Sequence, residues 1–170
     1  MKKKKIYEGK IFNLSIHSGK IEGRKVKREI IEHPGASSMI AFDENDKLIL
    51  VKQHRFPHGF VLEIPAGTLE KNEKPIDCAF RELEEETGYR ARKMTSLITY
   101  YPSIGYNSEK IYCFVASGLK KVPGLKLDDD EILSVVKIDI KKVISMIKKG
   151  EIQDSKTICA IMTYVAKKKL

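Results

Sequence analysis

The segment from residue 75 to residue 87 constrains the fold most, because it reads as an amphipathic helix between segments of strand character. Pro75 suits the first turn of a helix, and Gly88 suits its C-terminal stop. Four apolar residues recur at helical spacing and share one face: Ile76, Ala79, Phe80 and Leu83. This helix must therefore pack in a fold that also contains strands.

Strands are expected on both sides of this helix. Before it we predict strands at residues 38–42 and 48–53, a turn at 43–47 and a short strand ending at 64–65. After it we predict strands at 95–101, 110–116 and 132–138. Strands before, between and after helices predict an α+β sandwich.

Two further amphipathic helices are expected at the end of the chain. One begins after Asp139 and ends at residues 149–150, with basic residues in its last turn. The other begins after Asp154, and four of its residues are expected to point inward: Ile158, Ile161, Met162 and Val165.

The N-terminal segment is expected to form a separate ribbon. Residues 6–33 read as short strands, with a turn at 17–20 and strong β-propensity at 26–31. Such a ribbon is too thin to bury its own apolar face, so it must pack on the main domain or on another subunit. Pro34 and Gly35 mark a boundary. We therefore predict an antiparallel β domain at 1–36 and a main domain at 37–170.

The net charge of +9 comes mostly from the two ends of the chain. Lysines at residues 2–5 and 167–169 account for seven of these charges, and we interpret them as solvated tails rather than as a nucleic-acid-binding arm. The apolar stretches are too short to span a bilayer, and no signal peptide follows the first lysines. We expect a cytoplasmic protein that binds neither membrane nor nucleic acid.

The three cysteines are expected to be buried, reduced thiols. Cys78, Cys113 and Cys159 each lie among apolar neighbours, and they are far apart in the sequence. There is no Cys-x-x-Cys pair and no histidine at ligand spacing, so no zinc site is expected.

Three glutamates of the helix at 75–87 lie close together, which costs stability unless a positive charge lies between them. Glu82, Glu85 and Glu86 stand at i, i+3 and i+4, so their carboxylates project from one side. Hard divalent cations prefer such carboxylate oxygens. Taken alone, these residues are more typical of a solvated acidic face than of a functional site.

The residues around the glutamates decide between these interpretations. Gly67 is followed after five residues by Glu73 and after seven more by the run Arg81-Glu82-Leu83-Glu84-Glu85-Glu86-Thr87-Gly88-Tyr89. This pattern resembles the Nudix hydrolase box, Gly-x5-Glu-x7-Arg-Glu-U-x-Glu-Glu-x-Gly-U, where U is a bulky aliphatic residue. Tyr89 is the one departure, and it affects packing rather than chemistry.

The resemblance implies a fold and a set of roles. The fold is a Nudix-type α/β/α sandwich with a mixed sheet, and the cofactor is Mg²⁺, with Mn²⁺ or another divalent ion as alternatives. Arg81 and Glu73 are expected to tie the loop to the helix, Gly67 to allow a tight turn and Gly88 a positive φ. The implied metal ligands are the Ala66 carbonyl and the carboxylates of Glu82, Glu85 and Glu86. Glu85 has the alternative role of orienting water.

The flanks of the box resemble the ADP-ribose pyrophosphatase branch of the family. They contain a Gln-x-Arg strand ending in Arg55, the lead-in Glu63-Ile64-Pro65-Ala66-Gly67, and Ser103-Ile104-Gly105 where the branch has Ser-Pro-Gly. The resemblance implies substrate contacts from Arg55, Glu63 and Gly105. Glu63 either binds a ribose or holds Arg55, and Arg55 has the alternative of a surface residue on a strand end.

The resemblance also implies a base and a partner. Glu131, in the acidic run at 128–131, matches the branch's catalytic base, although a solvated loop is the alternative. Glu109 is expected to approach the metals as a further catalytic residue. The N-terminal β domain of this branch exchanges between subunits, so a homodimer is expected.

These implications lead to one preferred function and two alternatives. The preferred reaction is hydrolysis of ADP-ribose to AMP and ribose 5-phosphate. The first alternative is another Nudix substrate, such as GDP-mannose, another sugar nucleotide or a dinucleotide. The second is a non-catalytic Nudix domain that senses a nucleotide, which is less favoured because all three glutamates are present.

Overall fold

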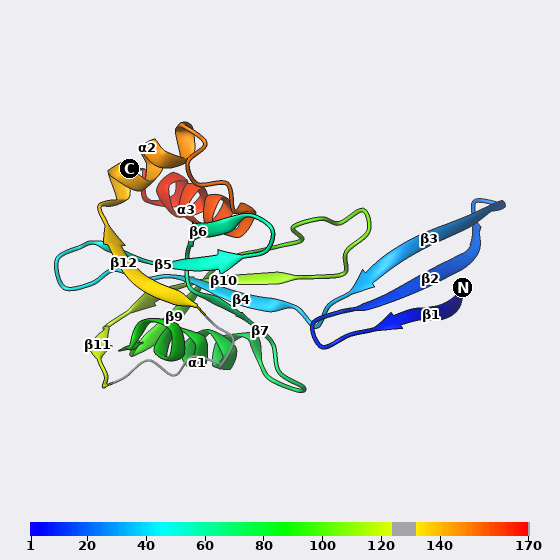
Figure 1. Cartoon of the computed structure of the whole chain (residues 1–170), viewed down its shortest axis with the longest axis horizontal. Helices are drawn as coiled ribbons and strands as arrows, with labels where there is room; N and C mark the ends of the chain where they lie inside the picture. Colours follow the sequence, from blue (N-terminus) through cyan, green and yellow to red (C-terminus); the bar gives the residue numbers. More distant parts are fainter. Residues whose placement is uncertain (124–131, 170) are drawn as a thin grey trace.

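Two layers of helices enclose a layer of strands in the body of the protein, and a ribbon of three strands projects from it (Figure 1). The computed structural model describes residues 1–123 and 132–169. Helix α1 (Pro75–Thr87) covers one face of the strand layer, while α2 (Ile140–Lys148) and α3 (Ser155–Lys168) cover the other. The predicted α/β/α sandwich is confirmed.

The strands of the body form a mixed arrangement. In the four-stranded sheet β7-β4-β10-β9, β10 runs parallel to β4 and antiparallel to β9. A second sheet has the order β12-β5-β6, and β11 pairs with β8. The strands are β4 (Ala36–Ile40), β5 (Leu48–Arg55), β6 (Gly59–Glu63), β7 (Ala66–Thr68), β8 (Tyr89–Arg90), β9 (Lys93–Tyr100), β10 (Ile111–Ser117), β11 (Lys120–Lys121) and β12 (Leu133–Ile138).

The end of β4 with the following Ala41, and the first half of β5, are buried on both faces, which explains the apolar runs at residues 39–41 and 48–51. Met39 and Ile49 join the core beneath α1, where they pack with Leu83. Ile40 and Leu50 point the other way, into the core shared with α2 and α3. This alternation follows from the two-residue period of a strand.

The ends of the helices follow the signals expected from the sequence. Pro75 opens α1, and Gly88 closes it with a φ of 68°, as predicted. The side chains of Asp139 and Asp154 cap α2 and α3 by accepting hydrogen bonds from Lys141 N and Thr157 N, both at 2.9 Å. Such caps satisfy N–H groups that would otherwise lack a partner at the start of a helix.

Two residues of α3 face outward, contrary to expectation. The buried stripe of this helix runs through Thr157, Ala160 and Ile161. Cys159 and Met162 lie on the opposite side of the helix, so Cys159 is exposed and Met162 is 40% exposed. Cys78 and Cys113 are buried, as predicted.

The projecting ribbon is an antiparallel sheet of β1 (Lys2–Glu8), β2 (Asn13–Ile21) and β3 (Arg24–Glu32), which we call the arm. The turn expected at residues 17–20 is wrong, because these residues belong to β2 and pair with β3. The chain turns instead at Glu22 and Gly23, with φ values of 48° and 76°. Residues 2–5, expected as a tail, form strand β1, because they pair in register with β2.

The C-terminal lysines also differ from the tail that was expected. Lys167 and Lys168 belong to the last turn of α3, and Lys167 Nζ donates to the Leu97 carbonyl at 2.6 Å. In the described ranges no helix is both long and apolar enough to cross a membrane.

Candidate active site

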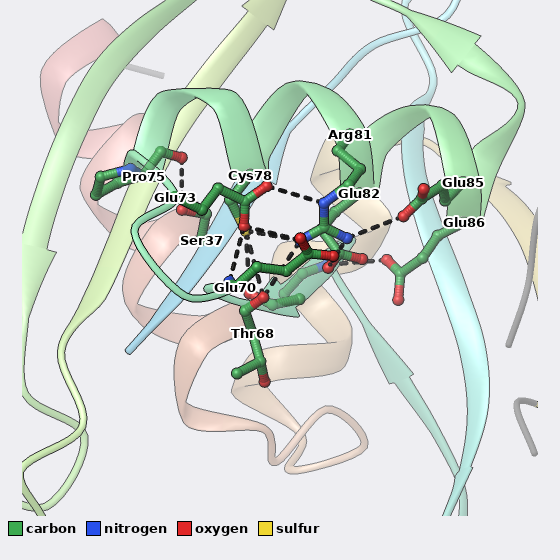
Figure 2. A network of polar contacts seen from close by, with 12 residues as sticks. Ser37, Thr68, Glu70, Glu73, Pro75, Cys78, Arg81, Glu82, Glu85 and Glu86 are labelled. Atoms are coloured by element: carbon green, nitrogen blue, oxygen red, sulfur yellow. Dashed lines mark hydrogen bonds and ion pairs between the residues drawn. The ribbon is translucent and has the colours of Figure 1, made fainter. Parts of the chain in front are cut away.

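Arg81 connects helix α1 to the loop in front of it. Its Nε and Nη2 atoms donate to the two carboxylate oxygens of Glu73 at 2.9 and 3.0 Å, which is the predicted fork (Figure 2). Its Nη1 atom also donates to Glu82 at 2.7 Å and to Glu85 at 2.9 Å. The hydrogen bonds from Arg81 hold the pKa of Glu73 below its usual range. The ion pair of Arg81 and Glu73, which we call the clamp, therefore stays charged.

Gly67 is required by the close approach of Glu82 rather than by a tight turn. It lies in strand β7, where it pairs with Ser37, which corrects the expected turn. A Cβ atom at this position would overlap the Glu82 carboxylate. The glycine therefore leaves the space in which this carboxylate lies against the backbone of β7.

The other two predicted metal-binding carboxylates lie near Glu82 but differ in exposure. The Glu85 side chain is 33% exposed and receives Arg81 Nη1. Glu86 is buried, and its Oε2 atom accepts a hydrogen bond from the Ala66 backbone N–H at 2.9 Å. Helix α1 brings Glu82, Glu85 and Glu86 to one region (Figure 2). Ala66 of β7 lies beside them, since its N–H donates to Glu86.

This donor set fits a hard divalent cation. Three carboxylates and a nearby backbone carbonyl supply oxygen ligands of the kind that Mg²⁺ binds. Arg81 supplies a positive charge between Glu82 and Glu85. In the described ranges, no three His, Cys, Asp or Glu side chains converge as closely as they do in a formed metal site.

A cavity of about 580 Å³ opens above these carboxylates. Cavities that bind small molecules commonly have volumes of this order. One part of its wall is acidic, and another carries cations from the sheet and from α3. The lining residues include Ile11, His33, Arg55, Ala66, Gly67, Glu70, Arg81, Glu82, Glu85, Glu109 and Lys156.

Arg55 reaches the cavity from the end of β5 and is held by Glu63. Its Nε and Nη2 atoms donate to the two oxygens of Glu63 at 2.9 and 3.0 Å. Glu63 is 3% exposed and is absent from the cavity lining, so its placement favours the role of holding Arg55 over a direct ribose contact. Burial would raise the pKa of Glu63, but Arg55 and Lys156 outweigh it and keep this pKa low.

Glu109 lines the cavity from the segment that precedes β10. Its Oε2 atom accepts from Asn107 Nδ2 at 3.1 Å, and its Oε1 atom lies 3.9 Å from His33 Nδ1. That histidine nitrogen accepts the Gly35 backbone N–H at 3.1 Å. Glu109 therefore borders the cavity, while its expected approach to the metals stays a prediction.

Three predicted site residues that the structure describes are absent from the cavity lining, namely Glu63, Glu86 and Gly105. Gly105 lies in the turn at 102–106, with open space around it and an ordinary φ. Glu131, with the rest of the acidic run at 128–131, lies outside the described residues. The next residue, Ile132, accepts a hydrogen bond from His54 N at 3.1 Å, one position from Arg55.

Sequence reasoning missed several residues that line the cavity, and three of them are Ile11, His33 and Lys156. They come from the arm, from the end of β3 and from the start of α3. No spacing rule connects them with the glutamates. The one available signal was the position of Lys156 two residues after the cap Asp154, which fixes it at a helix start.

The fold and site define the class of the protein. The family model of the NUDIX domain matches residues 32–161, which include the clamp, the three glutamates and most of the cavity lining. The chain belongs to the Nudix family.

Particular relatives are similar over almost the whole chain. The chain is 38% identical to the ADP-ribose pyrophosphatase of Bacillus subtilis (strain 168), covering 99% of this chain and 92% of that protein. It is 40% identical to the methanol dehydrogenase activator of Bacillus methanolicus, covering 95% and 89%. A crystal structure described as an ADP compounds hydrolase superimposes with a TM-score of 0.84 at 20% identity, covering 99% and 92%, which supports the fold.

Proposed function

We propose that this protein hydrolyses the diphosphate bond of ADP-ribose and releases AMP and ribose 5-phosphate. The observation that carries this proposal is the cavity in which Glu82 and Glu85 line one part of the wall and Arg55 another. A substrate with two linked phosphates has anionic oxygens for the arginine and needs a cation on the acidic side. The similarity to a B. subtilis protein named ADP-ribose pyrophosphatase supports this substrate over other nucleoside diphosphate derivatives.

Glu82, Glu85, Glu86 and the Ala66 carbonyl would hold Mg²⁺, with Mn²⁺ or another divalent ion as alternatives. When bound, such an ion neutralises the diphosphate and lowers the pKa of a water molecule. The chain itself supplies the positioning. Arg81 and Glu73 fix the helix against the loop, and Glu63 directs the guanidinium of Arg55 into the cavity.

The attacking water also needs a group that accepts its proton. Glu109 is a candidate because its carboxylate lines the cavity, and Glu131 is a candidate from the family resemblance. Either carboxylate would have to be ionised to act as a base. Gly105 is retained as a backbone contact for the substrate.

We further propose that the protein is a cytoplasmic homodimer that acts on a nucleotide and not on nucleic acid. The arm supports the dimer, because it exposes apolar side chains and contributes Ile11 to the cavity. The same arrangement supports the division into an N-terminal domain at 1–36 and a Nudix domain at 37–170.

A substrate panel tests the proposed function. We expect ADP-ribose with Mg²⁺ to give AMP and ribose 5-phosphate faster than GDP-mannose or a dinucleotide does. In Glu86→Gln, kcat should fall by about 100-fold or more, because a lost metal ligand costs several kcal/mol and about 1.4 kcal/mol is tenfold. Product release is measured by chromatography.

The matched control is Glu84→Gln on the same helix. The Glu84 carboxylate pairs with Arg90 at 2.7 and 2.9 Å and is absent from the cavity lining, so its loss should leave turnover within about twofold. Faster release from GDP-mannose would replace the proposed substrate. If wild type released no product from any compound, the protein would instead be a nucleotide-binding Nudix domain.

A further inference from the structure

Lys156 is a cation in the cavity wall that belongs to neither the box nor the loop around it. It is the second residue of α3, and the Asp154 cap fixes the start of this helix. Its side chain is 15% exposed, yet it lines the cavity together with Arg55 and Glu109. A lysine so largely buried requires partners, because burying an unpaired charge is costly.

Two carboxylates hold the ammonium group of Lys156. Nζ donates to Glu63 Oε2 and forms an ion pair with Asp154 Oδ1 at 3.0 Å. An ammonium group has three N–H donors, so these contacts leave one further donor. Among the contacts of the described residues, none engages that third N–H, and the side chain borders the cavity.

Lys156 and Arg55 are fixed on the same carboxylate. Glu63 receives Arg55 through Nε and Nη2, and it receives Lys156 on the oxygen that Nη2 also contacts. Within the part of the chain that the structure describes, no contact engages Nη1 of the guanidinium, which can donate to another acceptor. Two cations anchored to one buried carboxylate therefore present donors to the same cavity, opposite in charge to the wall formed by Glu82 and Glu85.

We propose that Lys156 donates its third N–H to an anionic oxygen of the substrate's diphosphate, beside Arg55. This inference rests on the proposed function, since it assigns a further contact to the same site. Because Glu63 and Asp154 hold Nζ in place, little side-chain freedom is lost when the substrate binds. Lys156 therefore contributes to affinity for the diphosphate more than to the chemical step.

The test is a set of binding measurements with a methylene-bridged analogue of ADP-ribose, which cannot be hydrolysed at the diphosphate. Calorimetry with Mg²⁺ should show an affinity loss of about tenfold or more in Lys156→Met, as expected for a lost charged hydrogen bond. Lys156→Arg should restore most of it. The control Lys142→Met removes an exposed lysine of α2 and should bind as wild type does.

A double variant separates direct contact from an effect through Arg55. If both residues contact the ligand, Lys156→Met should still weaken binding severalfold in an Arg55→Met background, although the factor differs from that in wild type because both cations share Glu63. If Lys156 only positions Arg55, its loss should have no effect there, and the proposal is overturned. Equal affinity of Lys156→Met and wild type also overturns it.

Two further readouts complete the set. With ADP-ribose, the value of KM should rise in Lys156→Met while kcat stays within about threefold. Thermal melting identifies a variant that fails to fold. If Lys156→Met does not fold, the affinities of Lys156→Arg and Lys156→Gln are compared, and the proposal requires the arginine variant to bind more tightly. A wild-type protein that binds the analogue but hydrolyses no substrate refutes the proposed function and leaves the lysine contact standing.

Discussion

At the scale of single residues, Gly67 shows how one hydrogen atom in place of a side chain shapes the site. Gly67→Ala introduces a Cβ that overlaps the Glu82 carboxylate, which must then move. We expect the dissociation constant for Mg²⁺ to rise by about 10- to 100-fold, the range typical of disturbed ligand orientation. Calorimetric titration with Mg²⁺ measures this change.

The control for this substitution is Gly19→Ala in the arm. There an added Cβ meets Met1 alone, with the closest atom of its flexible side chain at 3.0 Å. Its Mg²⁺ affinity should equal that of wild type. An unchanged affinity in Gly67→Ala would show that the position of the Glu82 carboxylate has no importance for the ion.

Glu63 links the site to stability through its charge. Its pKa in the folded protein lies below the ordinary value of 4.5, because Arg55 and Lys156 outweigh the effect of burial. The stabilisation is therefore complete above pH 4.5 and is lost as the pH falls through the lowered pKa. We expect melting temperatures between pH 3 and 7 to fall more steeply below pH 4.5 in wild type than in Glu63→Gln. Parallel curves would contradict this.

At the scale of elements, local rules identified the helices well. Residues 75–87 form α1 as expected, because its apolar spacing, first-turn proline and final glycine all act within one helix. The carboxylates of the box were predictable for the same reason. Lys156, His33 and Ile11 were not, because they reach the cavity through the packing of separate elements.

The errors in the arm have a similar origin. Both Ser18-Gly19 and Glu22-Gly23 are compatible with a turn, so local sequence does not decide between them. The cross-strand register decides, since it pairs Lys20 with Lys25 and Ile21 with Arg24. Pairing also converts residues 2–5 from an expected tail into strand β1. Neither the register of β2 with β3 nor the pairing of β1 with β2 is determined by the few residues that surround each position in the sequence.

At the scale of the whole molecule, the arm is a sheet without a second layer. It meets the body mainly at its end, where Ile31 N donates to the Tyr106 carbonyl and Ser108 N donates to the Ile31 carbonyl, both within 2.9 Å. A thin sheet gains stability when another surface covers it. Several of its large apolar side chains are exposed: Ile6, Tyr7, Ile11, Phe12 and Ile21.

A second copy of the chain is the partner that we propose for this surface. Light scattering should give a mass of twice the 19.4 kDa of one chain at micromolar concentration. Phe12→Asp, which places a charge among these apolar side chains, should shift the mass toward the monomer. Met162→Asp alters an exposed apolar residue of α3 instead and should leave the dimer intact. A wild-type mass of one chain would contradict the proposed dimer. Phe12 and its apolar neighbours in the arm would then remain exposed to water.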